Sequence, residues 1–269
     1  MKNIIVSTES VNHSDEYELV YSNIDCLNRL FQAHILADEV SQDAMRSYYV
    51  DYYLSQMDNG GFTQFIYNSH WNSEAIRYVL EGLDSIKAVK NLVLFEQSAK
   101  VLDGFGIDKI RQYLEGTYFG TNEERDILSG FDDEFFALKK DEDLVHLNYL
   151  WLKNHPDLEI LNDEEITAHI ERIADAIPNI EERRKAAMDA EPRYLKLIKA
   201  LCNKSGQVLE RITTGDPSKI YRKKKVMAWH FITNEGHHHM LEFENEAIMF
   251  KGNSEETMLT ISAGDEYGV

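Results

Sequence analysis

The densest set of side chains with metal-binding chemistry lies near the C-terminal end, where three consecutive histidines, residues 237–239, follow His230. Alternate side chains of a β-strand share a face, so His237 and His239 are expected together and His238 opposite. A tight turn near residues 235–236 would bring His230 across from them, and three imidazoles can bind zinc. A register slip of one residue would separate the rings, so a polar strand without metal is the simpler interpretation.

Other catalytic signatures are absent from the sequence. It contains no GxSxG, no HExxH and no Rossmann glycine pattern, and no cofactor is indicated. Cys26 and Cys202 are the only cysteines and lie far apart, which argues against a disulfide framework or a cysteine-built zinc site. We therefore expect a binding protein, with a metal-dependent enzyme that uses His230, His237 and His239 as an alternative.

Carboxylates are far more abundant than any of these groups. The 269 residues include 47 acidic and 28 basic side chains, a formal net charge of −19. Residues 121–182 alone hold 18 acidic and 5 basic side chains, a net charge of −13. This balance argues against direct binding to nucleic acid or to anionic membranes, and it favours a basic protein as partner.

Short acidic clusters supply the candidate partner-binding residues. They are Asp132, Asp133, Glu134, Asp141, Glu142, Asp143, Asp163, Glu164 and Glu165. Any one cluster is explained by a solvated helix N-terminus, and Asn162 with Glu165 forms a capping-box pattern. Capping does not require so large a local charge, so the clusters together predict an acidic binding surface; a surface that only confers solubility is the alternative.

One basic block interrupts the acidic chain. Residues 183–225 hold 13 basic and 4 acidic side chains. They either form ion pairs with the acidic middle of the chain or make a patch for an acidic partner, and we favour internal pairing for residues 183–204. The compact run of residues 222–225 (Arg-Lys-Lys-Lys) is expected to be exposed, as a solvated linker.

These side chains must be positioned mainly by α-helices. Apolar residues recur at intervals of three and four over residues 15–36 and 41–57, which predicts two amphipathic helices. The same spacing predicts further helices over residues 73–83, 89–104, 107–115, 143–154, 163–176, 180–189 and 192–213. The apolar stripe of the last helix is expected in the core, with a homodimer interface as the alternative.

The pattern changes after residues 215–217 (Gly-Asp-Pro), which are expected to break the last helix. Residues 226–263 contain short β-prone runs separated by turn residues: VMAWHFI, HHMLEF, AIMF and TMLTIS. The predicted fold class is therefore mainly α, a multi-helix bundle-like domain over residues 1–215. A small antiparallel β meander follows over residues 216–269.

Asn59, Gly60 and Gly61 interrupt a helical pattern on both sides. Neither flank alternates as a hairpin strand would, and no preceding strand or GxxxxGK[ST] motif supports a phosphate-binding loop. Glycine tolerates the left-handed conformation that ends a helix, so this run is predicted to be a helix C-cap, with the next helix starting at once.

The segment YYVDYYLSQMDNGGFTQFIYNS, residues 48–69, resembles the bacterial domain family of unknown function to which a DNA-mimic protein belongs. The resemblance extends over about residues 15–150. It implies an all-α fold in which Asn59, Gly60 and Gly61 make the turn while Phe62 and Phe65 pack in the core. It also implies an activity: carboxylates arranged like phosphates occupy the DNA-binding surface of a transcription regulator. It implies no catalytic residue.

The leading hypothesis is thus an acidic protein-binding module that acts as a DNA mimic. An immunity or antitoxin-like protein that neutralises a basic toxin or nuclease would use the same electrostatics with one dedicated partner. The sequence contains no apolar stretch long enough for a membrane span and no secretory signal at its start, so a cytoplasmic location is expected.

Overall fold

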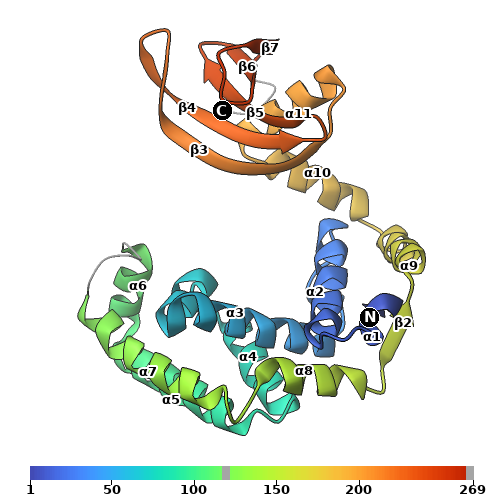
Figure 1. Cartoon of the computed structure of the whole chain (residues 1–269), viewed down its shortest axis with the longest axis vertical. Helices are drawn as coiled ribbons and strands as arrows, with labels where there is room; N and C mark the ends of the chain where they lie inside the picture. The colour runs from blue at the N-terminus through green and yellow to red at the C-terminus, as the bar shows by residue number, and fades with distance from the viewer. Residues whose placement is uncertain (117–121, 265–269) are drawn as a thin grey trace. The chain divides into compact units, whose positions relative to one another are not determined.

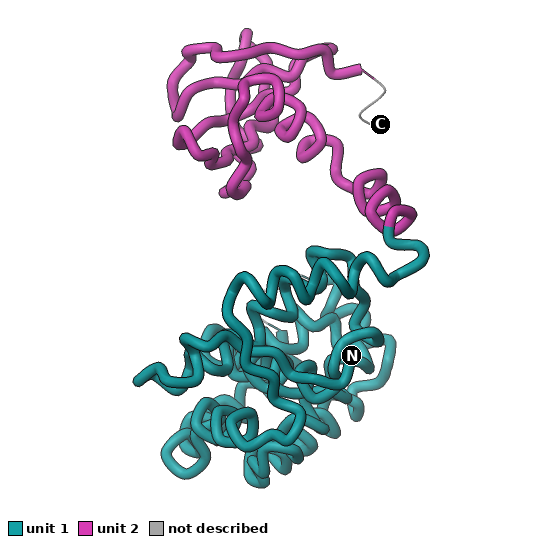
Figure 2. Tube along the Cα trace, turned by 90° about the vertical axis from the view of Figure 1, so that its right-hand side faces the viewer, with its two compact units in different colours: residues 1–180 teal, residues 181–269 magenta. Residues whose placement is uncertain are grey.

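The computed structural model describes residues 1–116 and 122–264. The chain divides into two compact units, unit 1 (Met1–Ile180) and unit 2 (Glu181–Val269), which Figure 2 shows in different colours. This division lies earlier than the boundary at 215–216 expected from the sequence, because a helix before that boundary packs on the sheet of unit 2. None of the helices in the described ranges combines the length and apolar character needed to cross a lipid bilayer.

Unit 1 is a helical domain with a two-stranded parallel sheet (Figure 1). Its elements are β1 (Ile4–Ser7), α1 (Thr8–Val11), α2 (Tyr17–Gln32), α3 (Gln42–Ser69), α4 (Ser73–Ser85), α5 (Val89–Gly104), α6 (Ile107–Glu115), α7 (Glu123–Leu138), α8 (Leu144–Lys153), β2 (Leu158–Leu161) and α9 (Asp163–Asp175). Together with the sheet of unit 2, they confirm the predicted fold class of a mainly α chain with a C-terminal β meander.

The sequence prediction does not include α7 or the parallel pair β1–β2. Asn122 caps α7 by accepting the N–H of Arg125 at 2.7 Å, and the helix buries Leu128 and Phe135, seven residues apart. In the sheet, Ile4 pairs with Leu158, and most of the sequence of unit 1 lies between these two residues. Such a pairing depends on tertiary packing, and no local pattern indicates it.

An aromatic core joins α3, α5 and α7. Tyr53 contacts the edges of Phe65, Phe95 and Phe135, with ring centroids 5.6, 5.2 and 5.7 Å away, and Phe62 packs on Phe65 and Phe95. All five side chains are buried. Edge-to-face pairs add specific geometry to the burial of apolar area, so this core fixes which faces of α5 and α7 point to solvent.

The helix break predicted at Asn59, Gly60 and Gly61 is confirmed as a kink within α3. Gly60 and Gly61 leave the helical conformation, with φ of −164° and +75°. The helix resumes at Phe62, whose N–H donates to the Asp132 carboxylate of α7 at 2.8 Å. The φ of Gly61 favours glycine, and a Cβ there would lie 2.2 Å from Asp132 Oδ2, so the Asp132 carboxylate would have to leave its bond to Phe62.

Unit 2 consists of helices followed by a five-stranded antiparallel meander in the order β3-β4-β5-β6-β7. Its elements are α10 (Ile180–Ala190), α11 (Arg193–Ser205), β3 (Leu209–Tyr221), β4 (Lys224–Thr233), β5 (Gly236–Phe243), β6 (Glu246–Lys251) and β7 (Thr257–Ser262). The four predicted β-prone runs correspond to β4–β7, and β3 is an additional edge strand.

The prediction of one helix over residues 192–213 is wrong at its C-terminal end. Gly206, with φ of +74°, caps α11, and the chain then forms β3, with Leu209 opposite Thr233 of β4. Residues 215–217, expected to end a helix, instead lie within β3 beside a register irregularity between Asp216 and Lys219. Pairing with β4 therefore overrides the helical spacing of the apolar residues in this stretch.

The apolar stripe of α11 is core, as preferred from the sequence. Leu197, Ile198 and Leu201 are buried against Phe231 and Met249 of the sheet. Because these side chains are covered within unit 2, this stripe is not available as the homodimer interface that was the alternative interpretation.

Candidate partner-binding surfaces

The charge of the protein is divided sharply between the two units. Unit 1 contains 33 acidic and 14 basic residues, and unit 2 contains 14 of each. The whole net charge of −19 therefore belongs to unit 1, and unit 2 is neutral. Any surface that attracts a basic partner by its charge is expected on unit 1.

Three of the nine candidate carboxylates, on α7 and on the loop that follows it, act as helix caps or ion-pair partners for α3 and α5. Asp132 caps the second half of α3; burial raises the pKa of its carboxyl, and the Phe62 N–H opposes that rise. Asp141 pairs with Lys90 at 2.6 Å. Glu142 accepts the N–H groups of Lys90 and Asn91 at 2.8 and 2.9 Å and so caps α5.

Three more candidates also have partners inside unit 1. Asp143 caps α8 by accepting the N–H groups of Val145 and His146. Asp163 pairs with Arg29 of α2 at 2.7 Å. Glu165 completes the predicted capping box with Asn162. These carboxylates already have partners inside the protein, so a partner molecule would have to compete for them.

The remaining candidates, Asp133, Glu134 and Glu164, are exposed and make no ion pair among the described residues. Asp133 and Glu134 lie on α7, whereas Glu164 lies on α9, on the opposite side of unit 1 in Figure 1. The nine carboxylates thus do not form one surface: the clusters at 132–134 and 141–143 lie near α5, and the cluster at 163–165 lies beside α2.

An apolar groove runs between α5 and α7 beside the first group. Its volume is about 470 Å³, and its lining residues are Val89, Lys90, Val93, Leu94, Gln97, Glu134, Ala137 and Leu138. Val89 and Val93 are 60% and 45% exposed, although the same helix buries Leu94 and Phe95 in the core. The groove therefore combines solvent-exposed valines with the carboxylate of Glu134 on its rim.

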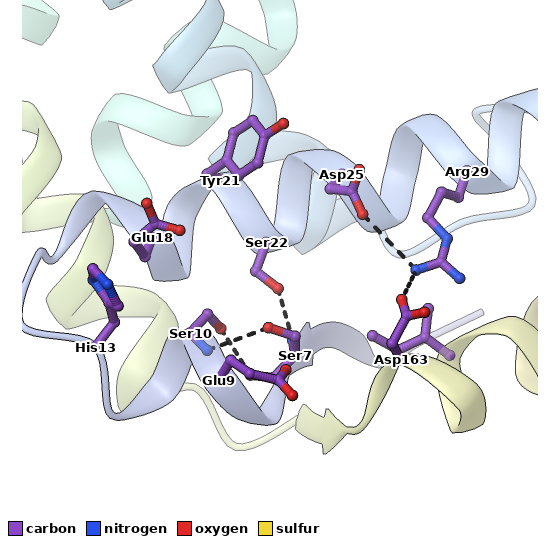
Figure 3. A pocket seen from close by; sticks show the side chains of 11 residues that line it. Ser7, Glu9, Ser10, His13, Glu18, Tyr21, Ser22, Asp25, Arg29 and Asp163 are labelled. Carbon is purple, nitrogen blue, oxygen red and sulfur yellow. Dashed lines mark hydrogen bonds and ion pairs between the residues drawn. The ribbon is translucent and has the colours of Figure 1, made fainter. Parts of the chain in front are cut away.

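A second, acidic pocket of about 260 Å³ lies where α1, α2 and α9 meet (Figure 3). It is lined by the carboxylates of Glu9, Glu18, Asp25 and Asp163 together with His13, Arg29 and several small or apolar residues. Asp163 neutralises Arg29, which also bonds Thr167 at 2.6 Å. Glu9 and Glu18 make no ion pair among the described residues, and each lies in the first turn of a helix, where a negative charge is favoured.

The basic block pairs mainly inside unit 2. Arg184 pairs with Glu181, Lys199 with Glu191, and Arg193 with Glu242. Arg193 also donates to the carbonyl groups of Ala263 and Gly264, and Lys196 donates to the carbonyl of Asp189. Internal pairing is thus observed for these residues: Glu181 is the last but one residue of the acidic stretch 121–182, and the other partners lie further along the chain in unit 2. Lys185, Lys204, Arg211 and residues 222–225 make no ion pair among the described residues.

The histidines share one face of the sheet, as the sequence predicted. His230 lies opposite His239, and its ring stacks on His237 and His239 at centroid distances of 5.2 and 5.3 Å. Burial lowers the pKa of His230 and of His239. Nδ1 of His230 lies 3.1 Å from Nε2 of His237, whereas Nδ1 of His239 is bonded to the carbonyl of Gly252. Among the described residues no group of His, Cys, Asp or Glu is arranged to hold a metal ion.

Neither cysteine has the environment of a nucleophile. Cys26 and Cys202 are both buried and reduced. Burial raises the pKa of the Cys26 thiol to about 12 and also raises the pKa of Cys202. Both remain thiols at neutral pH, which makes them poor nucleophiles.

Comparison with known proteins finds a similarity in the central part of the chain. Residues 38–155 match the family model of the DMP19-like proteins. This DMP19-like segment includes the α3 kink, the aromatic core and the α5–α7 groove. No curated protein and no solved structure matches the chain.

Sequence reasoning missed the α5–α7 groove and the acidic pocket between α1, α2 and α9. Glu9, Glu18 and Asp25 are scattered among apolar positions, and only the packing of α1, α2 and α9 brings them together with Asp163. Val89 and Val93 have the spacing of core residues. Their exposure follows from α5 burying its other face, a choice that periodicity alone does not reveal.

Proposed function

We propose that this protein is an acidic protein-binding module that occupies the DNA-binding surface of a basic protein such as a transcription regulator, as a DNA mimic. The observation that carries the proposal is the confinement of the whole net charge of −19 to unit 1, the unit that contains the DMP19-like segment. A basic site that normally pairs with phosphates gains comparable electrostatic energy from fixed carboxylates.

The α5–α7 face is the proposed contact surface. Asp133 and Glu134 on α7 supply charges that no internal partner neutralises within the described residues, and Val89 and Val93 supply exposed apolar area in the groove that Glu134 lines. Protein interfaces commonly combine an apolar centre with a polar rim. A partner with an apolar side chain flanked by lysine or arginine fits this combination.

The test is capture of binding proteins on immobilised, full-length protein at low and at high salt, with identification by mass spectrometry. Recovery of a DNA-binding protein that is released by salt and by competing duplex DNA supports mimicry, because both treatments act on phosphate-like contacts. Capture of one protein that resists both treatments instead favours the immunity or antitoxin alternative.

Variants of equal charge then locate the surface. D133N/E134Q is expected to lower the affinity for the captured protein about tenfold, which corresponds to about 1.4 kcal/mol. E171Q/D175N removes the same charge from exposed positions on α9 and serves as the matched control. Equal losses in both variants would show that only the overall charge matters and would exclude the α5–α7 face as the specific site.

A further inference from the structure

The β3–β4 hairpin ends in the most concentrated positive charge of the protein. Ile220 pairs with Lys225 and Tyr221 with Lys224, which leaves Arg222 and Lys223 as a two-residue turn (Figure 1). We name residues 222–225 the hairpin tip. All four cationic side chains are exposed, and none makes an ion pair among the described residues.

The conformation of the turn is unfavourable for the residues it contains. Arg222 and Lys223 have φ of +46° and +67°, the left-handed region that a two-residue hairpin of this kind requires at both positions. Asparagine and glycine adopt it with little strain, whereas long side chains do not. Arginine and lysine at these positions therefore put two cations at the outermost point of the hairpin at the expense of backbone strain, a combination that often marks a functional site.

Aromatic rings hold part of the charge in place. The guanidinium of Arg222 lies 5.1 Å from the centre of the Tyr221 ring and 5.5 Å from that of Phe243, and the Lys224 ammonium lies 5.2 Å from Phe243. Phe243 is itself buried in the sheet. These cation–π contacts orient the cations without neutralising them, so their charge remains available to a ligand.

The tip is denser in unpaired cations than the rest of the basic block, in which Lys185, Lys204 and Arg211 also make no ion pair among the described residues but lie far apart in the sequence. Arg184, Arg193 and Lys199 each have a carboxylate partner within unit 2. Unit 2 is neutral overall, and several of its other basic residues are paired with carboxylates. The four adjacent unpaired cations therefore produce a local positive field around the tip. A solvated linker, the role expected from the sequence, would not need ordered strands on both sides.

We propose that the hairpin tip binds nucleic acid through its phosphate backbone, an activity beyond the proposed function of unit 1. Consecutive residues of a strand point to opposite faces, so Lys224 and Lys225 project to the two sides of the ribbon. Arg222 folds back over the Tyr221 and Phe243 rings, beside Lys224, and Lys223 occupies the turn itself. A groove of duplex DNA admits a two-stranded ribbon and presents phosphates along both walls. An acidic protein surface, in contrast, would engage one face.

Exposed apolar side chains flank the cations. Ile220 is 60% exposed and Met227 is 41% exposed, and both lie on the strands that lead to the tip. They offer apolar contact to sugars and base edges once phosphates hold the ribbon in place. The negative charge of unit 1 opposes DNA at long range, so the affinity of the full chain is expected to be modest and to depend on the ionic strength.

The experiment measures fluorescence anisotropy of a labelled random-sequence duplex DNA titrated with the full-length protein over a series of salt concentrations. Four phosphate contacts predict a slope of about −3.6 in log K against log salt. R222Q/K223Q/K224Q/K225Q is expected to abolish the binding. The matched control K185Q/K204Q/R211Q/K251Q neutralises four exposed residues of unit 2 that make no ion pair among the described residues, and it is expected to retain most of the affinity.

Competition with polyglutamate of equal charge separates the two classes of polyanion. The proposal is supported if DNA binds at the tip and polyglutamate displaces only a small part of it. Polyglutamate binding that equals or exceeds DNA binding overturns it in favour of an acidic protein partner. Equal losses of DNA affinity in the tip variant and in the control variant also overturn it, because the effect would then depend only on net charge. An absence of DNA binding at the lowest salt concentration overturns it too.

Discussion

The carboxylate of Asp132 accepts the N–H of Phe62 at 2.8 Å, across 70 residues of sequence, and so begins the second half of α3. This contact ties the most recognisable motif of the chain to a residue that the sequence assigns to partner binding. Asp132 and Asp133 are adjacent, yet one supports the fold and the other is exposed. Substitutions at these two positions therefore distinguish a contribution to folding stability from a contribution to partner binding.

We expect D132A to lower the free energy of unfolding by about 1–2 kcal/mol, because the N-terminus of a helix segment loses its cap. D133A is the matched control and is expected to change stability by less than about 0.5 kcal/mol, as is usual at exposed positions. Urea denaturation followed by far-UV circular dichroism measures both values. Equal destabilisation by the two variants would contradict the assigned role of Asp132.

G61A is expected to destabilise the protein. Helix propensity alone would predict the opposite, because alanine favours a helix more than glycine does. The added Cβ meets the Asp132 carboxylate, and the φ of +75° strains any residue that has a side chain. Strain at such a position is of the order of 1–3 kcal/mol. Thermal unfolding of G61A alongside D132A tests it, and a stable G61A would mean that α3 does not need the kink.

Asp51 gives a pH dependence of stability whose sign follows from its pKa. Burial raises the pKa of its carboxyl to about 6, and the hydroxyl of Tyr17 opposes that rise. The folded state therefore binds the proton more tightly than the unfolded state, so stability is lost as pH rises from about 4 to about 6. D51N removes the buried charge and is expected to raise stability at pH 7 by about 1–2 kcal/mol and to remove this pH step. An unchanged pH profile in D51N would contradict the prediction.

The histidines of the sheet give the opposite sign. Burial lowers the pKa of His230, His238 and His239, so the unfolded state takes up protons first and the stability of unit 2 falls as pH drops below about 6.5. Hydrogen exchange of β4 and β5, corrected for the intrinsic rate, is expected to be faster at pH 5 than at pH 7. H239Q is expected to reduce this difference, and an exchange pattern that is independent of pH would contradict it.

Substitutions in the turn of the hairpin tip are expected to have opposite effects on stability and on polyanion binding. R222N/K223G supplies the residues that its turn prefers and is expected to stabilise unit 2 by about 1–2 kcal/mol while weakening polyanion binding. R222Q/K223Q removes the same two charges but keeps the strain, so it is expected to weaken binding equally without a gain in stability. Differential scanning calorimetry and anisotropy on both variants test the two effects separately.

The sequence by itself determined the mainly α-helical body, the break in α3, strands β4–β7 of the meander and the shared strand face of His237 and His239. Each of these follows from a local pattern: apolar spacing, glycine conformation or strand alternation. The total charge, and its concentration in the acidic middle of the chain, also needed no structure.

Only the tertiary structure decided which carboxylates are available to a partner. Asp132, Glu142 and Asp163 have partners at least 50 residues away in the sequence, so no local pattern distinguishes them from Asp133 or Glu134. The same holds for β3, whose apolar spacing favours a helix until β4 supplies its hydrogen bonds. A carboxylate's role depends on which donors the fold brings to it, and that information is non-local.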